Sequence, residues 1–211
     1  MNLKLFHYWR SSASWRVRWG LEIKGVPVDY HAVDLLKGEE KQSTYHQVNP
    51  SGYLPSLVVD GKQVLGESLA ILEWLEENYP KPSFFVGDSF DRARIRQAAE
   101  SINSGIQPLQ NLDVIRRLSD KKEVQDEWIR HWILRGLSVY ESLIVSAGKV
   151  GKYSFGDSPS LADLCLIPQC YSAQRFQVDL SPFKNVKKIY EFALSTGECA
   201  RSHPDRYQPK N

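Results

Sequence analysis

The sequence predicts an α+β fold in which a thioredoxin-like domain is followed by an all-α domain. Over the first part of the chain, short alternating segments typical of strands and segments typical of helices follow one another. Beyond a proline-containing stretch the strand patterns disappear, and the rest of the chain has helical periodicity. We therefore place the thioredoxin-like domain at residues 1–79, a linker at 80–83 and the all-helical domain at 84–211.

The elements of the first domain occur in the order strand, helix, strand, hairpin, helix. Residues 3–7 and 28–33 alternate between apolar and polar side chains and predict two strands around a helix that ends near Lys24. Asp60-Gly61 is a strong hairpin-turn signal between two short apolar runs. Pro55 directly precedes this hairpin, where a proline is tolerated and its peptide bond can be cis. This order is typical of a thioredoxin-like domain.

The second domain consists of helical segments. Ser160 and Asp163 have the spacing of a capping box, so we expect a structural role for Asp163 at the start of a core helix. The cleft between the two domains is the expected binding site. The clearest helical segments are 91–103, 122–147, 161–175 and 184–195.

Serine residues stand at the start of both predicted helices of the first domain. Ser11, Ser12 and Ser14 lie at the beginning of the first helix, and Ser68 opens the second. A helix N-terminus presents unpaired N–H groups and a partial positive charge. A serine at this position either caps the helix or directs its hydroxyl toward an anion, and the serines alone leave both interpretations open. Two such termini in one domain suit a small ligand with two anionic ends.

The composition is typical of a globular enzyme and excludes several other classes. A net charge of +2, without a basic run that contains aromatic residues, argues against a nucleic-acid surface. The three cysteines are wrongly spaced for a zinc site or a disulfide framework, and we expect no metal and buried thiols. No apolar segment approaches the ~20 residues that span a bilayer, and no signal-peptide core is present, so we expect a cytoplasmic protein without membrane partners.

Several runs of residues resemble one family. Residues 11–18, SSASWRVR, are similar to the signature Ser-Ser-Cys-x-Trp-Arg-Val-Arg of zeta-class glutathione transferases, also known as maleylacetoacetate isomerases. The runs IQPLQNL at 106–112 and RFQVDL at 175–180 are also specific to this class, whereas Leu-Pro at 54–55 and Glu-Ser at 67–68 occur across glutathione transferases. The resemblance covers nearly the whole chain. It implies an all-α glutathione-transferase C-terminal domain and a homodimer.

The resemblance also implies a glutathione site. Ser11 is expected to donate a hydrogen bond to the thiolate, with Ser12 as the alternative donor, because a hydroxyl and a helix N-terminus both favour the anion. Ser68 is expected to bind the γ-glutamyl carboxylate and Glu67 the ammonium, while the backbone of Leu54 binds the cysteinyl part. The residues expected to contact glutathione are Ser11, Ser12, Ala13, Ser14, Trp15, Arg16, Leu54, Pro55, Glu67, Ser68, Gln107 and Asn111.

The implied reaction is the glutathione-dependent cis–trans isomerisation of maleylacetoacetate or maleylpyruvate in the catabolism of tyrosine, phenylalanine and other aromatic compounds. Arg175 is expected to bind a substrate carboxylate, with a surface arginine as the alternative. Gln107 and Asn111, four residues apart, share one face if the helix continues through them. Arg16 and Arg18, two residues apart, cannot both face the cleft, so we expect one of them in a structural ion pair.

Ala13 stands where the signature has cysteine, so any thiol chemistry must come from bound glutathione. Ala13 and Gly20 both depart from the class pattern and favour a first alternative, a broader glutathione transferase that conjugates or dehalogenates electrophiles. A second alternative is a non-enzymatic binding module, since chains of this architecture also occur as translation-associated or chloride-channel-like proteins. The retention of Ser11 and Ser68 argues against that alternative.

Overall fold

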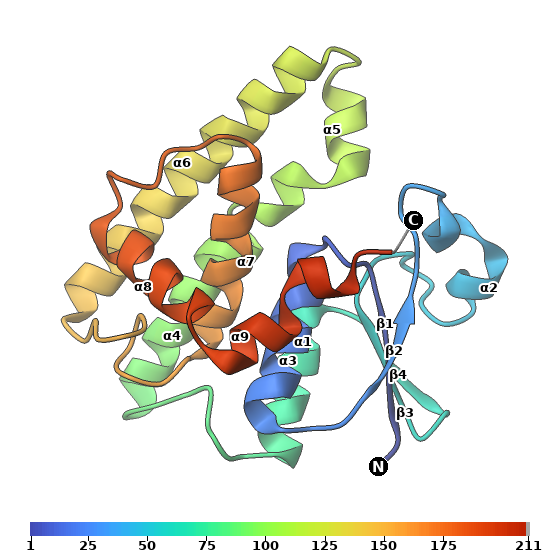
Figure 1. The fold of residues 1–211 in the computed structure, drawn as a ribbon, viewed down its shortest axis with the longest axis horizontal. Helices are drawn as coiled ribbons and strands as arrows, with labels where there is room; N and C mark the ends of the chain where they lie inside the picture. The colour runs from blue at the N-terminus through green and yellow to red at the C-terminus, as the bar shows by residue number, and fades with distance from the viewer. Residues whose placement is uncertain (210–211) are drawn as a thin grey trace. The chain divides into compact units, whose positions relative to one another are not determined.

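A four-stranded mixed sheet forms the centre of the first of two compact units in the computed structural model, which describes residues 1–209 (Figure 1). The strand order is β2-β1-β3-β4, with β1 parallel to β2 and antiparallel to β3. Asp60 and Gly61 both have positive φ in the turn between β3 and β4, which confirms the predicted hairpin. The strands are β1 Leu3–His7, β2 Asp29–Ala32, β3 Ser56–Val59 and β4 Gln63–Leu65.

Helix α1 is almost completely buried within this first unit. It packs against α3 and α9, and Figure 1 shows the red α9 beside the blue α1. The helix ends where Gly25 adopts the left-handed conformation, with φ 63°. The helical elements of this unit are α1 Ser12–Lys24, η1 Glu39–Lys41, α2 Ser43–His46, α3 Ser68–Asn78, α9 Gly197–Ser202 and η3 Pro204–Tyr207.

The C-terminal segment from Thr196 belongs to this first unit, which otherwise comprises residues 1–83. The sequence predicts these last residues as part of the helical domain. In the structure they pack on α1 because Trp15 and Arg18 both bind Ser202, the last residue of α9. We call residues 1–83 with this segment the N-terminal unit.

The second unit, residues 84–195, is mainly helical and is built around α7. Residues 161–170 of this helix are all buried, and α7 packs on α4, α6 and α8. The backbone N–H and the hydroxyl of Ser160 both donate to Asp163 Oδ2, at 2.8 and 2.7 Å, which confirms the capping box. The helical elements are α4 Ser89–Asn103, η2 Gln107–Gln110, α5 Leu112–Leu118, α6 Lys122–Ala147, α7 Leu161–Arg175 and α8 Lys184–Leu194.

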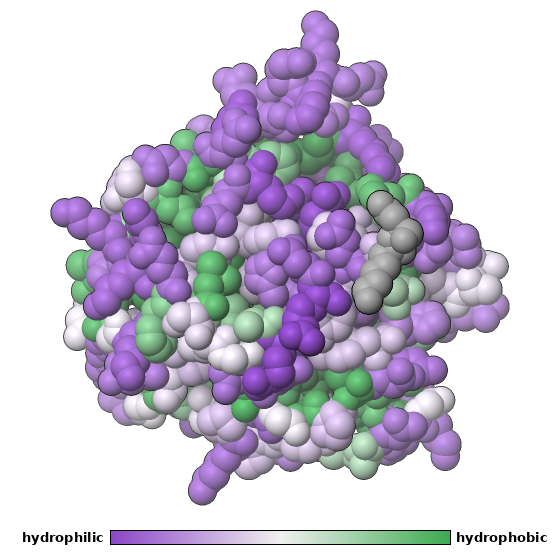
Figure 2. Space-filling model, in the orientation of Figure 1, coloured by the Kyte–Doolittle hydropathy of each residue, from purple (hydrophilic) through white to green (hydrophobic). Residues whose placement is uncertain are grey.

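The surface is largely polar on the face drawn in Figure 2, where hydrophobic residues form small separate groups among hydrophilic ones. Among residues 1–209, no helix is long and apolar enough to cross a membrane. The same residues contain no cluster of His, Cys, Asp or Glu that could hold a metal ion. All three cysteines are buried, as the sequence predicts.

Candidate functional site

Ser11 lies at the turn between β1 and α1. Its backbone N–H donates to the Tyr8 carbonyl at 3.2 Å, and its Oγ accepts the Ser14 N–H at 3.1 Å as the N-cap of α1. A serine hydroxyl carries one donor hydrogen and two acceptor lone pairs, and capping uses only one lone pair. Within residues 1–209 this hydroxyl donates to no acceptor. Capping and anion binding, which the sequence leaves as alternatives, are therefore compatible in one half-buried side chain.

The residues that follow Ser11 divide into two groups. Ser12 and Ala13 are partly exposed in the first turn of α1. Ser14, Trp15 and Arg16 are completely buried. The Ser14 Oγ accepts the Tyr8 N–H at 3.3 Å, and the Trp15 indole donates to Ser202 Oγ at 3.1 Å. The Ser14 side chain therefore supports the turn and the Trp15 side chain binds α9, so direct contact with a ligand is left to the backbone atoms of these residues.

The second helix N-terminus begins at Ser68, which is 5% exposed. Glu67 precedes it as the N-cap residue with φ 58° and ψ 110°, and its side chain makes no capping hydrogen bond. A positive φ is uncommon for a residue other than glycine, and it typically persists at a functional site because the surrounding structure enforces it. The exposed Glu67 and the first turn of α3, whose N–H groups have no partner within the helix, form an end suited to a charged ligand.

Arg16 connects the two helix N-termini. Its fully buried Nη1 donates to Ser68 Oγ at 2.8 Å, across 52 residues of sequence. One side chain of α1 thereby fixes the start of α3 relative to the Ser11 turn. The sequence places Arg16 either near the ligand or in a structural ion pair, and this link between the two helices depends on the tertiary structure.

The backbone at Leu54 supplies a third group to the site. The Leu54–Pro55 peptide bond is cis, and the N–H and C=O of Leu54 make no hydrogen bond within the described part of the chain. The neighbouring carbonyl of Tyr53 accepts hydrogen bonds from the Asn49 amide at 2.9 Å and the Tyr45 hydroxyl at 2.7 Å. Asn49 and Tyr45 thus hold the loop while Leu54 stays available. Neither residue is recognisable from the sequence as a support for Leu54, since neither stands in a pattern with it.

Gln107, Asn111 and Arg175 lie in the helical unit. Gln107 and Asn111 would share one face only if a helix continued through both, and it does not, because Gln107 lies in η2 and Asn111 is the extended N-cap of α5. Pro108 has no N–H to continue an α-helix. Arg175 is the exposed last residue of α7. The Ser172 hydroxyl, one turn before it, donates to Gln110 at 3.1 Å, so η2 and the end of α7 lie together.

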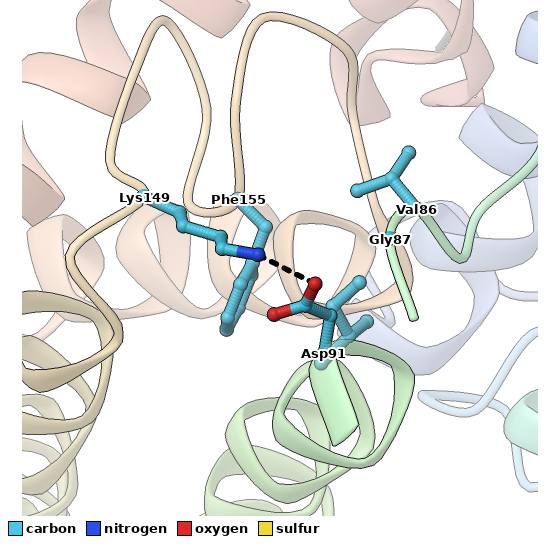
Figure 3. A pocket seen from close by; sticks show the side chains of 6 residues that line it. Val86, Gly87, Asp91, Lys149 and Phe155 are labelled. Atoms are coloured by element: carbon cyan, nitrogen blue, oxygen red, sulfur yellow. Dashed lines mark hydrogen bonds and ion pairs between the residues drawn. The ribbon is translucent and has the colours of Figure 1, made fainter. Parts of the chain in front are cut away.

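A separate small cavity of about 140 Å³ lies within the helical unit (Figure 3). Its walls are mainly apolar, and its charged groups, Asp91 and Lys149, form an ion pair with each other. Asp91 also completes the capping box of α4 with Asp88. Because these polar groups already serve the fold, the cavity is a weaker candidate site than the two helix N-termini.

Comparison with known proteins agrees with this geometry. The family described as "Glutathione S-transferase, N-terminal domain" matches residues 5–83. The chain is 41% identical to probable maleylacetoacetate isomerase 2 of Drosophila melanogaster, over 95% of this chain and 87% of that protein.

Two solved structures extend the likeness to the whole chain. A bacterial maleyl pyruvate isomerase, described as a zeta-class glutathione S-transferase, has a TM-score of 0.93 and 38% identity, and the match covers 99% of each chain. Maleylacetoacetate isomerase from Anaeromyxobacter dehalogenans 2CP-1, solved with GSH in its active site, has a TM-score of 0.88 and 43% identity over 99% of this chain and 97% of that one. The chain therefore belongs to the zeta class of glutathione transferases, the family of the maleylacetoacetate isomerases.

Proposed function

We propose that this protein is a glutathione-dependent cis–trans isomerase of maleylacetoacetate or maleylpyruvate. The observation that carries the proposal is the pair of helix N-termini that begin with serine and are joined by Arg16. The Arg16 Nη1 donates to Ser68 Oγ at 2.8 Å. The donor hydrogen of Ser11 and the unpaired backbone of Leu54 belong to the same unit. These groups match the three parts of glutathione: a thiol, a peptide backbone and a charged γ-glutamyl end.

Activation of the thiol is the first task of the site. A free thiol has a pKa near 8.5, and lowering it by two requires roughly 2.7 kcal/mol of preferential stabilisation of the thiolate. A hydrogen bond to a charged group contributes about 1.5–3 kcal/mol. A helix N-terminus adds about 0.3–1 kcal/mol. The Ser11 hydroxyl and the first turn of α1, which includes Ser12, together supply a stabilisation of the required size.

The remainder of glutathione is bound by backbone and charged groups. The Leu54 N–H and C=O pair with the cysteinyl backbone in the manner of a strand. Ser68 and the N–H groups of α3 bind the γ-glutamyl carboxylate, and the exposed Glu67 carboxylate binds the ammonium. The Arg16 guanidinium orients the Ser68 hydroxyl, because its donation to Oγ leaves the hydroxyl hydrogen to point toward the ligand.

The isomerisation itself needs no net proton transfer or oxidant. The thiolate adds to the double bond of the cis acid, and the bond electrons move onto the conjugated carbonyl to form an enolate. The former double bond is then single and can rotate. Collapse of the enolate expels the thiolate and forms the trans double bond, so glutathione is a cofactor. Arg175 binds a substrate carboxylate through the planar fork of its guanidinium.

The wider context follows the family resemblance. We propose that the protein acts in the cytoplasm as a homodimer, in the catabolism of tyrosine, phenylalanine or related aromatic compounds. Its partner is a small acidic substrate, without nucleic acid or membrane. Light scattering of the purified protein tests the dimer: a mass of one 24.2 kDa chain would refute it.

A specific observation keeps the broader transferase as a second candidate. Ala13 is partly exposed in the first turn of α1, where the class signature has cysteine. The site could therefore conjugate glutathione to small electrophiles and release the adduct. Isomerisation regenerates the thiol, whereas conjugation consumes it.

Thiol titration during turnover decides between the two. The protein is incubated with glutathione and each cis acid, and the cis and trans acids are separated by chromatography while free thiol is counted. Isomerase activity converts cis to trans with the thiol count unchanged. Loss of one thiol per acid consumed would support the transferase, and no turnover of either acid would refute the isomerase.

The same assay applied to Ser11→Ala tests the role of Ser11 in turnover. Ser142→Ala on the exposed face of α6 serves as a matched serine control for Ser11→Ala.

A further inference from the structure

Arg18 is a buried cation beside the turn that leads to Ser11. It is 0% exposed, and burial lowers its pKa to about 10, so the guanidinium remains protonated at neutral pH. Buried charges in proteins are usually paired with an opposite charge. Within residues 1–209, however, no carboxylate forms an ion pair with Arg18. Its charge is instead offset by oxygen and nitrogen acceptors and an aromatic ring.

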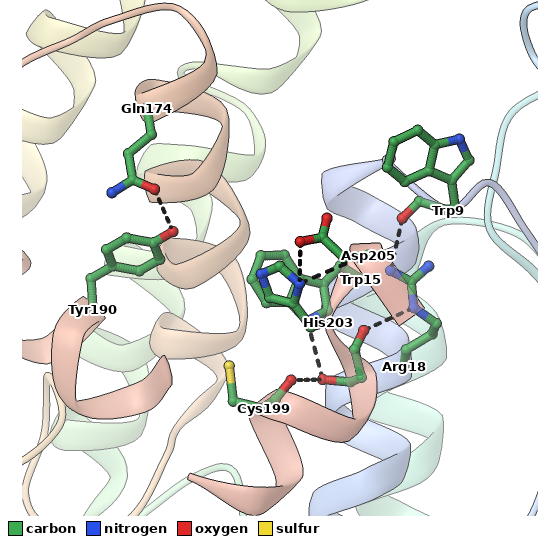
Figure 4. A network of polar contacts seen from close by, with 9 residues as sticks. Trp9, Trp15, Arg18, Gln174, Tyr190, Cys199, His203 and Asp205 are labelled. Carbon is green, nitrogen blue, oxygen red and sulfur yellow. Dashed lines mark hydrogen bonds and ion pairs between the residues drawn. The ribbon is translucent and has the colours of Figure 1, made fainter. Parts of the chain in front are cut away.

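One set of these partners belongs to the turn before Ser11. Arg18 Nη2 donates to the Trp9 carbonyl at 2.9 Å, a contact drawn in Figure 4. Nη1 donates to the Tyr8 carbonyl at 3.4 Å, and the same carbonyl accepts the Ser11 N–H at 3.2 Å. Nη1 also lies 3.1 Å from Nδ1 of His7. Burial and Arg18 hold the pKa of His7 at about 3, so its ring is neutral and Nδ1 accepts.

The other partners belong to the C-terminal segment. Arg18 Nε donates to the Ser202 carbonyl at 3.1 Å, across 184 residues of sequence. The guanidinium carbon lies 4.5 Å from the centre of the Tyr207 ring, a cation–π contact. The Tyr207 ring in turn packs edge-on against His7, with ring centres 5.3 Å apart. The segment from Ser202 to Tyr207 therefore holds the guanidinium together with the turn.

From these contacts we infer that Arg18, held by Ser202 and Tyr207, is a positioning residue that sets the Ser11 hydroxyl for its hydrogen bond to the thiolate. Hydrogen bonds weaken steeply away from linear geometry, so a small movement of the turn would reduce stabilisation of the thiolate. Lysine cannot replace Arg18, because a single ammonium lacks the planar fork that reaches two carbonyls and Ser202 at once. The inference rests on the proposed role of Ser11.

Three variants of the full-length protein test this inference. Arg18→Lys keeps the charge and removes the fork, and Tyr207→Leu removes a ring that contacts Arg18 and His7 but not Ser11. The control is Arg201→Gln, which breaks the Arg201–Glu22 ion pair of 2.8 Å that also attaches α9 to α1 but does not reach the turn. The readouts are the pKa of enzyme-bound glutathione, from thiolate absorbance against pH, the dissociation constant of glutathione, and the thermal midpoint.

We expect Arg18→Lys to raise the thiol pKa by about one and to lower kcat about tenfold, with glutathione affinity changed less than about threefold. Tyr207→Leu should shift the thiol pKa in the same direction by a smaller amount. Arg201→Gln should lower the thermal midpoint and leave the thiol pKa at the wild-type value.

Two results would overturn the inference: a folded Arg18→Lys protein with the wild-type thiol pKa, or a shift in Arg201→Gln as large as in the other variants. If Arg18→Lys does not fold, Tyr207→Leu decides by the same readout, and an unshifted pKa refutes the inference. A wild-type protein that binds glutathione without lowering its thiol pKa would refute the proposed role of Ser11 itself. The failure of the inference and the failure of the proposed function are therefore distinguishable.

Discussion

Ser11 performs two functions that substitutions can separate. Its Oγ accepts the Ser14 N–H at 3.1 Å to cap α1, and its hydroxyl hydrogen is available to a thiolate. Threonine at this position retains both the acceptor and the donor. Aspartate retains the capping acceptor, but it has no hydrogen to donate at neutral pH and places a negative charge beside the thiolate. Alanine removes both functions.

The expected magnitudes follow from these contacts. Loss of the cap in Ser11→Ala costs about 1 kcal/mol of stability. For a chain of this size, such a loss lowers the thermal midpoint by about 2–4 °C. Loss of the donor should raise the thiol pKa by about one or more, because a hydrogen bond to a charged group contributes about 1.5–3 kcal/mol. Turnover should fall by roughly 10²-fold, as for removal of a donor to a developing anion.

The assay combines thermal unfolding with the pH dependence of kcat/KM for the isomerisation. Ser11→Asp should melt near the wild-type temperature yet have the largest loss of activity, whereas Ser11→Thr should retain most of both properties. A Ser11→Asp protein with wild-type turnover would refute the donor role. Wild-type thiolate absorbance in Ser11→Ala would transfer that role to Ser12 or to the helix terminus alone.

Three further predictions concern other parts of the chain. Ala13→Cys should change substrate KM by a small factor only, and steady-state kinetics that show a gain of several orders of magnitude would contradict glutathione as the only reactive thiol. Arg175→Ala should raise KM for the acid substrate but preserve turnover of an uncharged electrophile, and Arg175→Lys should be intermediate; equal losses with both substrates would indicate a structural arginine. Burial, with a smaller contribution from Arg18, holds the pKa of His7 at about 3, against 6.5 when unfolded. The contribution of His7 to the free energy of unfolding should therefore be fully present above pH 6.5. It should be lost as the pH drops toward 3, by up to about 1.4 kcal/mol per pH unit. Urea unfolding at two pH values should show a shallower loss for His7→Gln, and an equal loss would refute this origin of acid sensitivity.

Local patterns were sufficient to predict the elements that bear the site. Asp60-Gly61 closes the hairpin because both positions adopt positive φ, and Ser160 and Asp163 form their capping box over three residues. Ser11 was likewise predicted at the start of α1. Each of these features depends on hydrogen bonds or backbone conformations within a few neighbouring residues, so sequence alone determines them. The resemblance to the zeta class added a prediction of which residues bind glutathione, and that prediction remains a proposal.

Only the tertiary structure decided what connects these elements. The sequence does not indicate that Arg16 binds Ser68, or that Arg18 binds Ser202, because the partners lie 52 and 184 residues apart. A buried guanidinium binds whichever carbonyl or hydroxyl the packed helices bring within reach of its fork. Packing of α3 and α9 on α1 therefore selects these partners.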